Sequence, residues 1–85
     1  MPPQTIDIQV VVNGQPTTVV AHEEHRLESI IHPALEQTHT TGQPVSNWEI
    51  RDAAGELLDV HREISSFHFA PDVRLFLNLK AGVGG

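Results

Sequence analysis

Asn13-Gly14 joins two segments in which apolar and polar residues alternate, an arrangement that predicts a β-hairpin. Asn and Gly both accept the positive φ that a two-residue type I′ turn requires. In residues 6–12 every second residue is Ile or Val, so these side chains share one face of a strand. Pairing with residues 17–21 places Val19 on the same face and leaves Pro16, which has no N–H, at a non-bonded or loop position. The hairpin therefore has an aliphatic face that another element must cover.

An amphipathic helix is predicted after the hairpin. Its apolar residues recur at spacings of three and four, at Leu27, Ile30, Ile31, Ala34 and Leu35. Pro33 interrupts this pattern, because inside a helix it crowds the carbonyl of Ser29 without donating to it, at a cost of about 3 kcal/mol. We therefore expect a kinked helix or two unequal helical pieces that end near Thr38.

The middle of the chain predicts several short elements. Residues 48–51 fit a strand whose first and third side chains face inward, and residues 52–55 fit the turn that follows it. A very short fourth strand is expected at Leu57-Leu58. Residues 62–67 fit a single helical turn beneath the core.

The last predicted strand, residues 73–80, alternates as clearly as the first, with an aliphatic residue at every odd position up to Leu79. The helix is long enough to cross the sheet, so the last strand can lie parallel to the first strand and beside it. One sheet covered by one helix buries the aliphatic faces of both. The sequence thus predicts an α+β protein with a β-grasp fold, in which one helix packs across a mixed sheet of four to five strands.

Glycine dominates the residues that follow the last strand. Residues 81–85 contain three glycines in five positions, and glycine has the most backbone freedom to lose on folding. We expect a ragged N-terminus at 1–5, a folded domain at 6–80 and a flexible tail at 81–85. A carboxylate on so narrow an arm fits a tight channel, where an ATP-using enzyme could adenylate it and a cysteine thiolate could displace AMP to form a thioester. The alternative is a frayed end without function.

Composition excludes several classes of function. The net charge of −6 argues against nucleic-acid binding, which needs clustered Lys and Arg. No apolar run approaches the roughly 18 residues of a membrane span, and the first residues lack the features of a signal peptide. The chain has no cysteine, so we expect a cytoplasmic protein without disulfides. We expect it to be monomeric and not to bind membranes. Lys80 is its only lysine.

In its order of elements and its Gly-Gly end, the chain resembles ubiquitin over residues 6–85. It is more similar still to the bacterial ubiquitin-like modifiers encoded in ubiquitination-like (Bub-type) operons. The segments that carry this resemblance are Ala34-Leu-Glu-Gln-Thr38, Gly42-Gln-Pro44, Asn47-Trp-Glu-Ile-Arg-Asp52, Gly55-Glu-Leu-Leu-Asp59 and Val73-Arg-Leu-Phe-Leu-Asn-Leu-Lys-Ala-Gly-Val-Gly-Gly85.

The resemblance implies a ubiquitin-like protein tag, which is not an enzyme and has no catalytic residue of its own. Its partners would be an ATP-dependent activating enzyme, a conjugating enzyme with a catalytic cysteine, a zinc-dependent isopeptidase and the target proteins. Gly85 would be the conjugated residue, with Gly84 beside it, and the tag itself would bind no cofactor. The tail residues that the activating and conjugating enzymes would read are Lys80, Ala81, Gly82 and Val83.

Phe76 is the candidate docking residue, because alternation places it on the outer face of the strand that leads into the tail. An outward aromatic side chain beside a functional tail can anchor a partner. Arg51 or Glu49 is its expected neighbour on the third strand, so the candidate docking surface comprises Phe76, Arg51 and Arg74. The alternative is that Phe76 packs under the tail.

Two other functions share this fold. One is a sulfur carrier, which resembles the small subunits of molybdopterin synthase and of the thiazole pathway and carries sulfur as a C-terminal thiocarboxylate. The other is a binding module that docks without covalent chemistry. No metal site is expected, because His22 and His25 are the only close pair among six histidines and no cysteine supports them. Trp48 is expected to pack in the core or at its rim.

Overall fold

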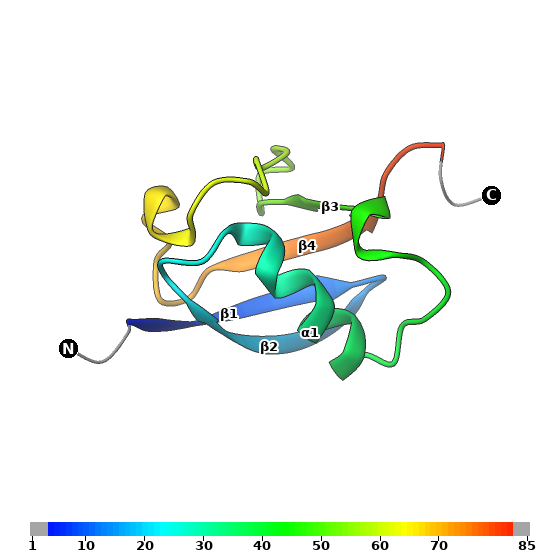
Figure 1. Cartoon of the computed structure of the whole chain (residues 1–85), viewed down its shortest axis with the longest axis horizontal. Helices are drawn as coiled ribbons and strands as arrows, with labels where there is room; N and C mark the ends of the chain where they lie inside the picture. Colours follow the sequence, from blue (N-terminus) through cyan, green and yellow to red (C-terminus); the bar gives the residue numbers. More distant parts are fainter. Residues whose placement is uncertain (1–3, 83–85) are drawn as a thin grey trace.

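A mixed sheet of four strands forms one layer of the protein, and a helical segment crosses one of its faces (Figure 1). The structure is a computed structural model and describes residues 4–82. The order of the strands across the sheet is β2-β1-β4-β3, in which β1 and β4 are parallel and the other neighbours antiparallel. The strands are β1 (Thr5–Val12), β2 (Gln15–His22), β3 (Trp48–Arg51) and β4 (Arg74–Leu79). This arrangement confirms the predicted β-grasp fold.

The predicted hairpin is confirmed in its turn and in its register. Asn13 has φ +50° and Gly14 has φ +81°, as a type I′ turn requires. Ile8 lies opposite Val19, and both side chains are buried. Pro16 lies within β2, which is an edge strand, so its missing N–H can face away from the sheet.

The helix is divided into two pieces, as Pro33 predicts. A 3-10 turn, η1 (Leu27–Ile30), leads directly into the α-helix α1 (Ile31–Gln37). Pro33 therefore lies in the first turn of α1. Backbone N–H groups there have no intrahelical acceptor, so the lack of an N–H on proline removes no hydrogen bond of α1. In the described part of the chain, no helix is long and apolar enough to cross a membrane.

The end of α1 is closed by a Schellman motif that contains a histidine in the place usual for glycine. The N–H of Thr40 donates to the carbonyl of Leu35 (2.9 Å), and the N–H of His39 donates to the carbonyl of Glu36 (3.2 Å). His39 has φ +55°, in the left-handed region. For a residue with a Cβ this conformation costs about 1–2 kcal/mol.

We expect His39→Gly to raise the free energy of unfolding by about 0.5–1 kcal/mol, because it removes this strain. The measurement is a urea unfolding curve of each protein. The matched control is His32→Gly, an exposed histidine in the first turn of α1, which should lower the free energy of unfolding by about 0.3–0.5 kcal/mol because Gly is a poorer helix former than His. The same sign at both positions would contradict the role given to the backbone of His39.

The strand predicted at Leu57-Leu58 is wrong. Within residues 4–82, Leu57 forms only an isolated bridge, to Arg51 in β3. The chain then leaves the sheet, because the carbonyl of Val60 accepts a hydrogen bond from the N–H of Glu28 in η1 (3.0 Å). Two other short elements lie near their predicted positions, as the strand β3 and the 3-10 turn η3 (Ile64–Phe67). A further 3-10 turn, η2 (Val45–Asn47), was not predicted.

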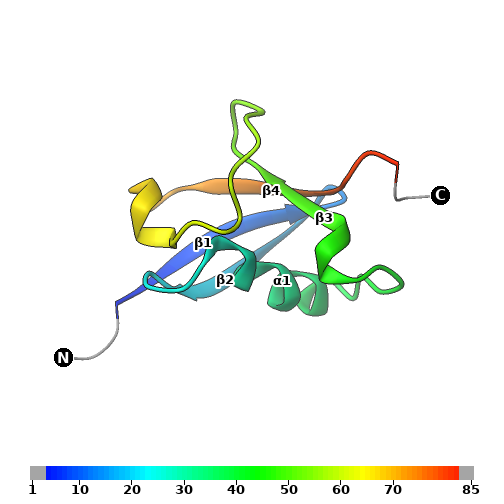
Figure 2. The ribbon, with the colours of Figure 1, turned by 45° about the horizontal axis from the view of Figure 1, so that its top comes forward.

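The core lies between the sheet and the helical segment, and Figure 2 shows α1 on one side of the sheet. Its largest fully buried side chains are Ile8, Leu27, Ile30, Ile31, Ile50, Ile64, Leu75 and Leu77. Thr38 is the buried polar residue of the described chain, and its hydroxyl donates to the carbonyl of Ala34 (2.9 Å). The face of the sheet that points away from α1 carries the candidate docking residues.

Candidate functional site

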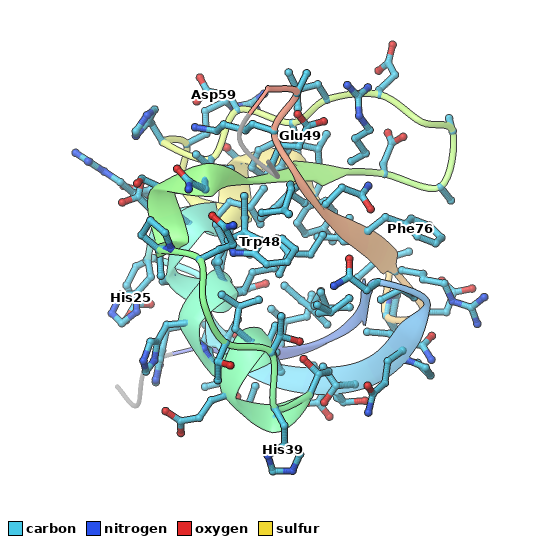
Figure 3. The ribbon with its side chains drawn as sticks, turned by 90° about the vertical axis from the view of Figure 1, so that its right-hand side faces the viewer. His25, His39, Trp48, Glu49, Asp59 and Phe76 are labelled. Carbon is cyan, nitrogen blue, oxygen red and sulfur yellow. The ribbon has the colours of Figure 1, made fainter. Side chains whose placement is uncertain are left out.

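Phe76 lies on the open face of the sheet, which we define as the face that points away from α1. Its neighbours along β4, Leu75 and Leu77, are fully buried, whereas Phe76 is only partly buried. Figure 3 shows its ring directed away from the core. The predicted alternation of β4 is therefore confirmed, and Phe76 is available on the strand that leads into the tail.

A row of four residues crosses the sheet at Phe76. Val11 of β1 lies beside Phe76 on one side, and Arg51 of β3 lies beside it on the other. Pro16 of β2 extends the row beyond Val11. We call these four residues the Phe76 row. Three of them are apolar, so the row offers a narrow apolar strip across a face that is otherwise polar apart from Val20.

Two arginines on the open face are held by neighbouring side chains. Arg51 Nε contacts Glu49 Oε2 at 2.7 Å, and another guanidinium N–H donates to the carbonyl of Gly55 (2.8 Å). Arg74 Nε donates to the side-chain oxygen of Gln9 (3.0 Å). The contact of Arg74 is exposed and adds little stability, whereas the Glu49 side chain beside Arg51 is only 17% exposed. Both contacts fix where the positive charges lie. The structure thus brings Phe76, Arg51 and Arg74 together on one face.

The tail begins where the sheet hydrogen bonds end. The N–H of Lys80 donates to the carbonyl of Asn47 (2.8 Å), which prolongs the pairing of β4 with β3 by one residue. Lys80, Ala81 and Gly82 are exposed, and Gly82 has φ +86°. The remaining tail positions named from the sequence, Val83, Gly84 and Gly85, lie outside the described residues.

The histidines do not gather into a metal-binding group. His22 and His25 lie near each other, with ring centroids 4.8 Å apart. Between Gln4 and Gly82, no three residues among His, Cys, Asp and Glu are placed to hold one metal ion. His61 and His32 instead face single carboxylates, with His61 Nδ1 at 2.9 Å from Glu28 Oε2.

Val11 and Pro16 were not recognised as part of the docking surface from the sequence. Their signal was nevertheless present, because a two-residue turn at Asn13-Gly14 fixes which residues of the two strands face each other. Counting back from the turn pairs Val11 with Pro16, on the face opposite to Val10 and Val12. The step from Val11 to Phe76 depends on the parallel register of β1 and β4, which no local pattern specifies.

Comparison with protein families and curated proteins gives two matches. Residues 1–85 match the model of a family described as Protein of Unknown function (DUF2604). The uncharacterized protein y4jI of Sinorhizobium fredii is 51% identical over 83 residues, which is 98% of this chain. The chain spans 64% of the length of that relative.

Comparison with solved structures gives ubiquitin-like folds. A protein designed on ubiquitin has a TM-score of 0.76 at 20% identity, with 99% of each chain covered. The ubiquitin of Caldiarchaeum subterraneum has a TM-score of 0.72 at 15% identity, over 96% of this chain and all of the other. A structure described as molecular mimicry of SUMO has a TM-score of 0.74 at 10% identity, over 93% of this chain and 96% of the other. The β-grasp fold of this chain is therefore of the ubiquitin-like type.

Proposed function

The chain belongs to the family described as Protein of Unknown function (DUF2604), and we propose that it is a ubiquitin-like protein modifier attached to its targets through Gly85. The observation that carries the proposal is the combination of a ubiquitin-like fold with a last strand that passes into Ala-Gly-Val-Gly-Gly after Lys80. A folded domain at 6–80 would serve as the recognised body, and residues 81–85 as the arm that delivers the carboxylate. The resemblance to modifiers of Bub-type operons supports the same assignment.

In the proposed chemistry the carboxylate is first activated, and its acyl group is then transferred three times: to two cysteines in turn and finally to an amine. A carboxylate oxygen of Gly85 attacks the α-phosphate of ATP in an activating enzyme, and pyrophosphate leaves. A cysteine thiolate then attacks the acyl adenylate, AMP leaves, and the resulting thioester passes to the cysteine of a conjugating enzyme. Finally, an amine of the target attacks the thioester, the thiol leaves, and an isopeptide bond forms. A zinc-dependent isopeptidase would hydrolyse that bond with water.

In this scheme the modifier contributes recognition and a reactive end. ATP binds to the activating enzyme, and the modifier holds no cofactor. We place the reactions in the cytoplasm, where ATP and reduced cysteines are available.

The proposal is tested by the intact mass of the protein isolated from its own cells. A modifier appears as a large covalent adduct of a second protein. Replacement of one carboxyl oxygen by sulfur would instead identify a sulfur carrier, and an unmodified mass under all growth conditions would identify a non-covalent module. Digestion of the adduct should leave the end of the tail, Gly85, on the acceptor residue.

Docking of the activating enzyme should depend on Phe76. We expect Phe76→Ala to keep the fold and to weaken binding to the activating enzyme by more than about 1 kcal/mol, because the Phe76 row would lose its largest apolar side chain. Titration calorimetry measures the binding, and a urea unfolding curve checks the fold. Val20→Ala, an exposed aliphatic on the same face at the edge strand β2, is the control and should bind normally. Unfolding of the Phe76 variant, or normal binding by it, would contradict the docking surface.

Chains of the modifier linked through lysine should be scarce. Lys80 is the only lysine, and it lies at the end of the sheet hydrogen bonds, where the arm begins. An enzyme that binds the arm would cover the Lys80 side chain and keep it from acting as an acceptor. Mass spectrometry of conjugates should show single tags on target residues, in the native protein and in Lys80→Arg alike. Abundant self-linked ladders that disappear in Lys80→Arg would contradict this expectation.

A further inference from the structure

The outer edge of β2 is the longer of the two edges of the sheet. β2 has eight residues, whereas β3, at the other edge, has four. The N–H of Leu58 donates to the carbonyl of Ile50 (2.9 Å), so part of the β3 edge is covered. Among residues 4–82, no segment outside the sheet forms a backbone hydrogen bond with Thr18 or Val20 of β2, the strand that borders the sheet in Figure 1.

Alternate residues of β2 direct their backbone groups to this edge. The N–H of Glu23 donates to the carbonyl of Gln4 (3.0 Å), in register with the pairs of the hairpin. Bonded residues alternate in an antiparallel pair, so the odd-numbered residues of β2 bond to β1. The N–H and C=O groups of Thr18 and Val20 consequently point outward, and both residues are exposed. These groups can pair with a further strand.

The two ends of the β2 edge differ in what their backbone offers. Pro16 presents a carbonyl at this edge but has no N–H to donate. His22 presents an N–H, but its carbonyl already accepts a hydrogen bond from the N–H of His25 (3.0 Å). One end therefore lacks a donor, and the other end needs none. When two copies of this edge lie antiparallel, these two ends meet.

One antiparallel register matches the groups of two such edges. In it, Thr18 lies opposite Val20 of a second copy, and the two residues exchange both hydrogen bonds. His22 then lies opposite Pro16 of that copy and donates to its carbonyl. A shift of two residues in one direction would place the carbonyl of Val20 opposite Pro16, where it finds no donor. A shift in the other direction would bring the N–H of Thr18 to the carbonyl of His22, which His25 already occupies.

The distribution of charge also favours a second copy at this edge. The chain carries a net charge of −6, so two copies repel each other in most orientations. β2 contains no Asp, Glu, Lys or Arg, although edge strands commonly carry charges that prevent pairing. The register described above sets Glu23 opposite Gln15 of the second copy and Glu24 opposite its Gly14. Both carboxylates therefore face uncharged residues.

Pairing at this edge would also cover Val20, whose side chain is 64% exposed. It would lie on the open face beside Thr18 of the second copy and diagonally across from the second Val20. One strand edge with one aliphatic pair buries less than the roughly 1,200 Å² of a stable interface. The association should therefore be weak, so the monomer expected from the sequence would prevail at micromolar concentration and the dimer near millimolar concentration.

We propose that two copies of the chain associate through β2, with Thr18 opposite Val20, and form one continuous sheet across a two-fold axis. Both helical segments then lie on one side of that sheet, and both open faces lie on the other. The dimer thus presents two Phe76 rows on the same face. The inference goes beyond the modifier chemistry and does not depend on Gly85.

The first test is a concentration series of the full chain labelled with ¹⁵N, with sedimentation equilibrium on the same samples. We expect a dissociation constant of about 0.1–1 mM and concentration-dependent amide shifts centred on Thr18, Val20 and His22. In a mixture of ¹³C-labelled and unlabelled chains, an isotope-filtered NOE should join the Hα of Thr17 to the Hα of Ala21 in the other copy, because this register makes them a close, non-hydrogen-bonded pair. A protein that stays monomeric at about 2 mM, or amide shifts confined to another surface, would overturn the proposal.

The second test is Thr18→Pro, which should weaken the dimer at least about tenfold. It removes an outward N–H without removing a bond between β2 and β1. The matched control is Thr18→Val, which keeps the N–H and should dimerise as well as the unchanged chain; urea unfolding curves check the fold of both variants. Undiminished dimerisation of Thr18→Pro, or an equal loss in both variants, would contradict pairing through the backbone.

If Thr18→Pro does not fold, the NOE between Thr17 and Ala21 decides alone, and its absence from a dimer would overturn the register. Deletion of Gly85 should leave the dissociation constant of the dimer unchanged, which separates this test from that of the modifier chemistry.

Discussion

Leu75→Ala is expected to lower the free energy of unfolding by about 2–5 kcal/mol. Leu75 is fully buried at the centre of β4 and lies opposite Val10 of β1 in the parallel register. Since β1 and β4 are the two central strands, a cavity at Leu75 is surrounded by elements that cannot easily collapse into it. A domain of this size has a total stability of about 5–15 kcal/mol, so the loss would take a large part of it.

The same loss is expected for Ile8→Ala and Leu35→Ala. Ile8 is a core side chain contributed by β1, and Leu35 is one contributed by α1. Urea unfolding curves measure all three variants. Asn78→Ala is the matched control, because Asn78 lies on β4 but on the open face, and it should change stability by less than about 0.5 kcal/mol. Losses under about 1 kcal/mol at all three core positions would mean that the two faces of the sheet are reversed.

Most of the fold could be predicted because its determinants are local. Alternation assigns the faces of β1 and β4, and a two-residue turn sets the register of the hairpin. Pro33 divides the helical segment through its own backbone chemistry, which depends on no distant contact.

The failures arise where distant segments meet. Leu57-Leu58 has the composition of a strand, but the backbone at Val60 bonds to Glu28, and that contact takes the chain away from β3. The same departure leaves a hollow of about 410 Å³ beside Trp48, so the error at Leu57 and this unpredicted hollow have one physical cause. The Phe76 row was missed in part for a related reason, since the position of Val11 beside Phe76 is set by the pairing of the first and last strands.

Deletion of Gly85 is expected to abolish adenylation and thioester formation, and Gly84→Val to do the same. The activating enzyme must bring the carboxylate to the α-phosphate of ATP through a passage that excludes bulk, and a displacement of one ångström can cost about a hundredfold in rate. Sheet hydrogen bonding ends at Lys80, so we expect either change to alter the free energy of unfolding by less than about 0.5 kcal/mol. The expected result is therefore loss of adenylation and thioester formation with an unchanged free energy of unfolding.

The assay is ATP–pyrophosphate exchange with the cognate activating enzyme, followed by a gel shift that a thiol reagent reverses. The control is Val20→Ser, a substitution on the edge strand β2, far from the arm. It should support full exchange, which would show that a surface substitution does not by itself lower the exchange rate. Full exchange by the protein that lacks Gly85 would mean that the carboxylate of Gly85 is not the reacting group. The modifier and the sulfur carrier would then both be excluded, because both are activated at that atom, and only a module that binds partners through surfaces such as the Phe76 row would remain.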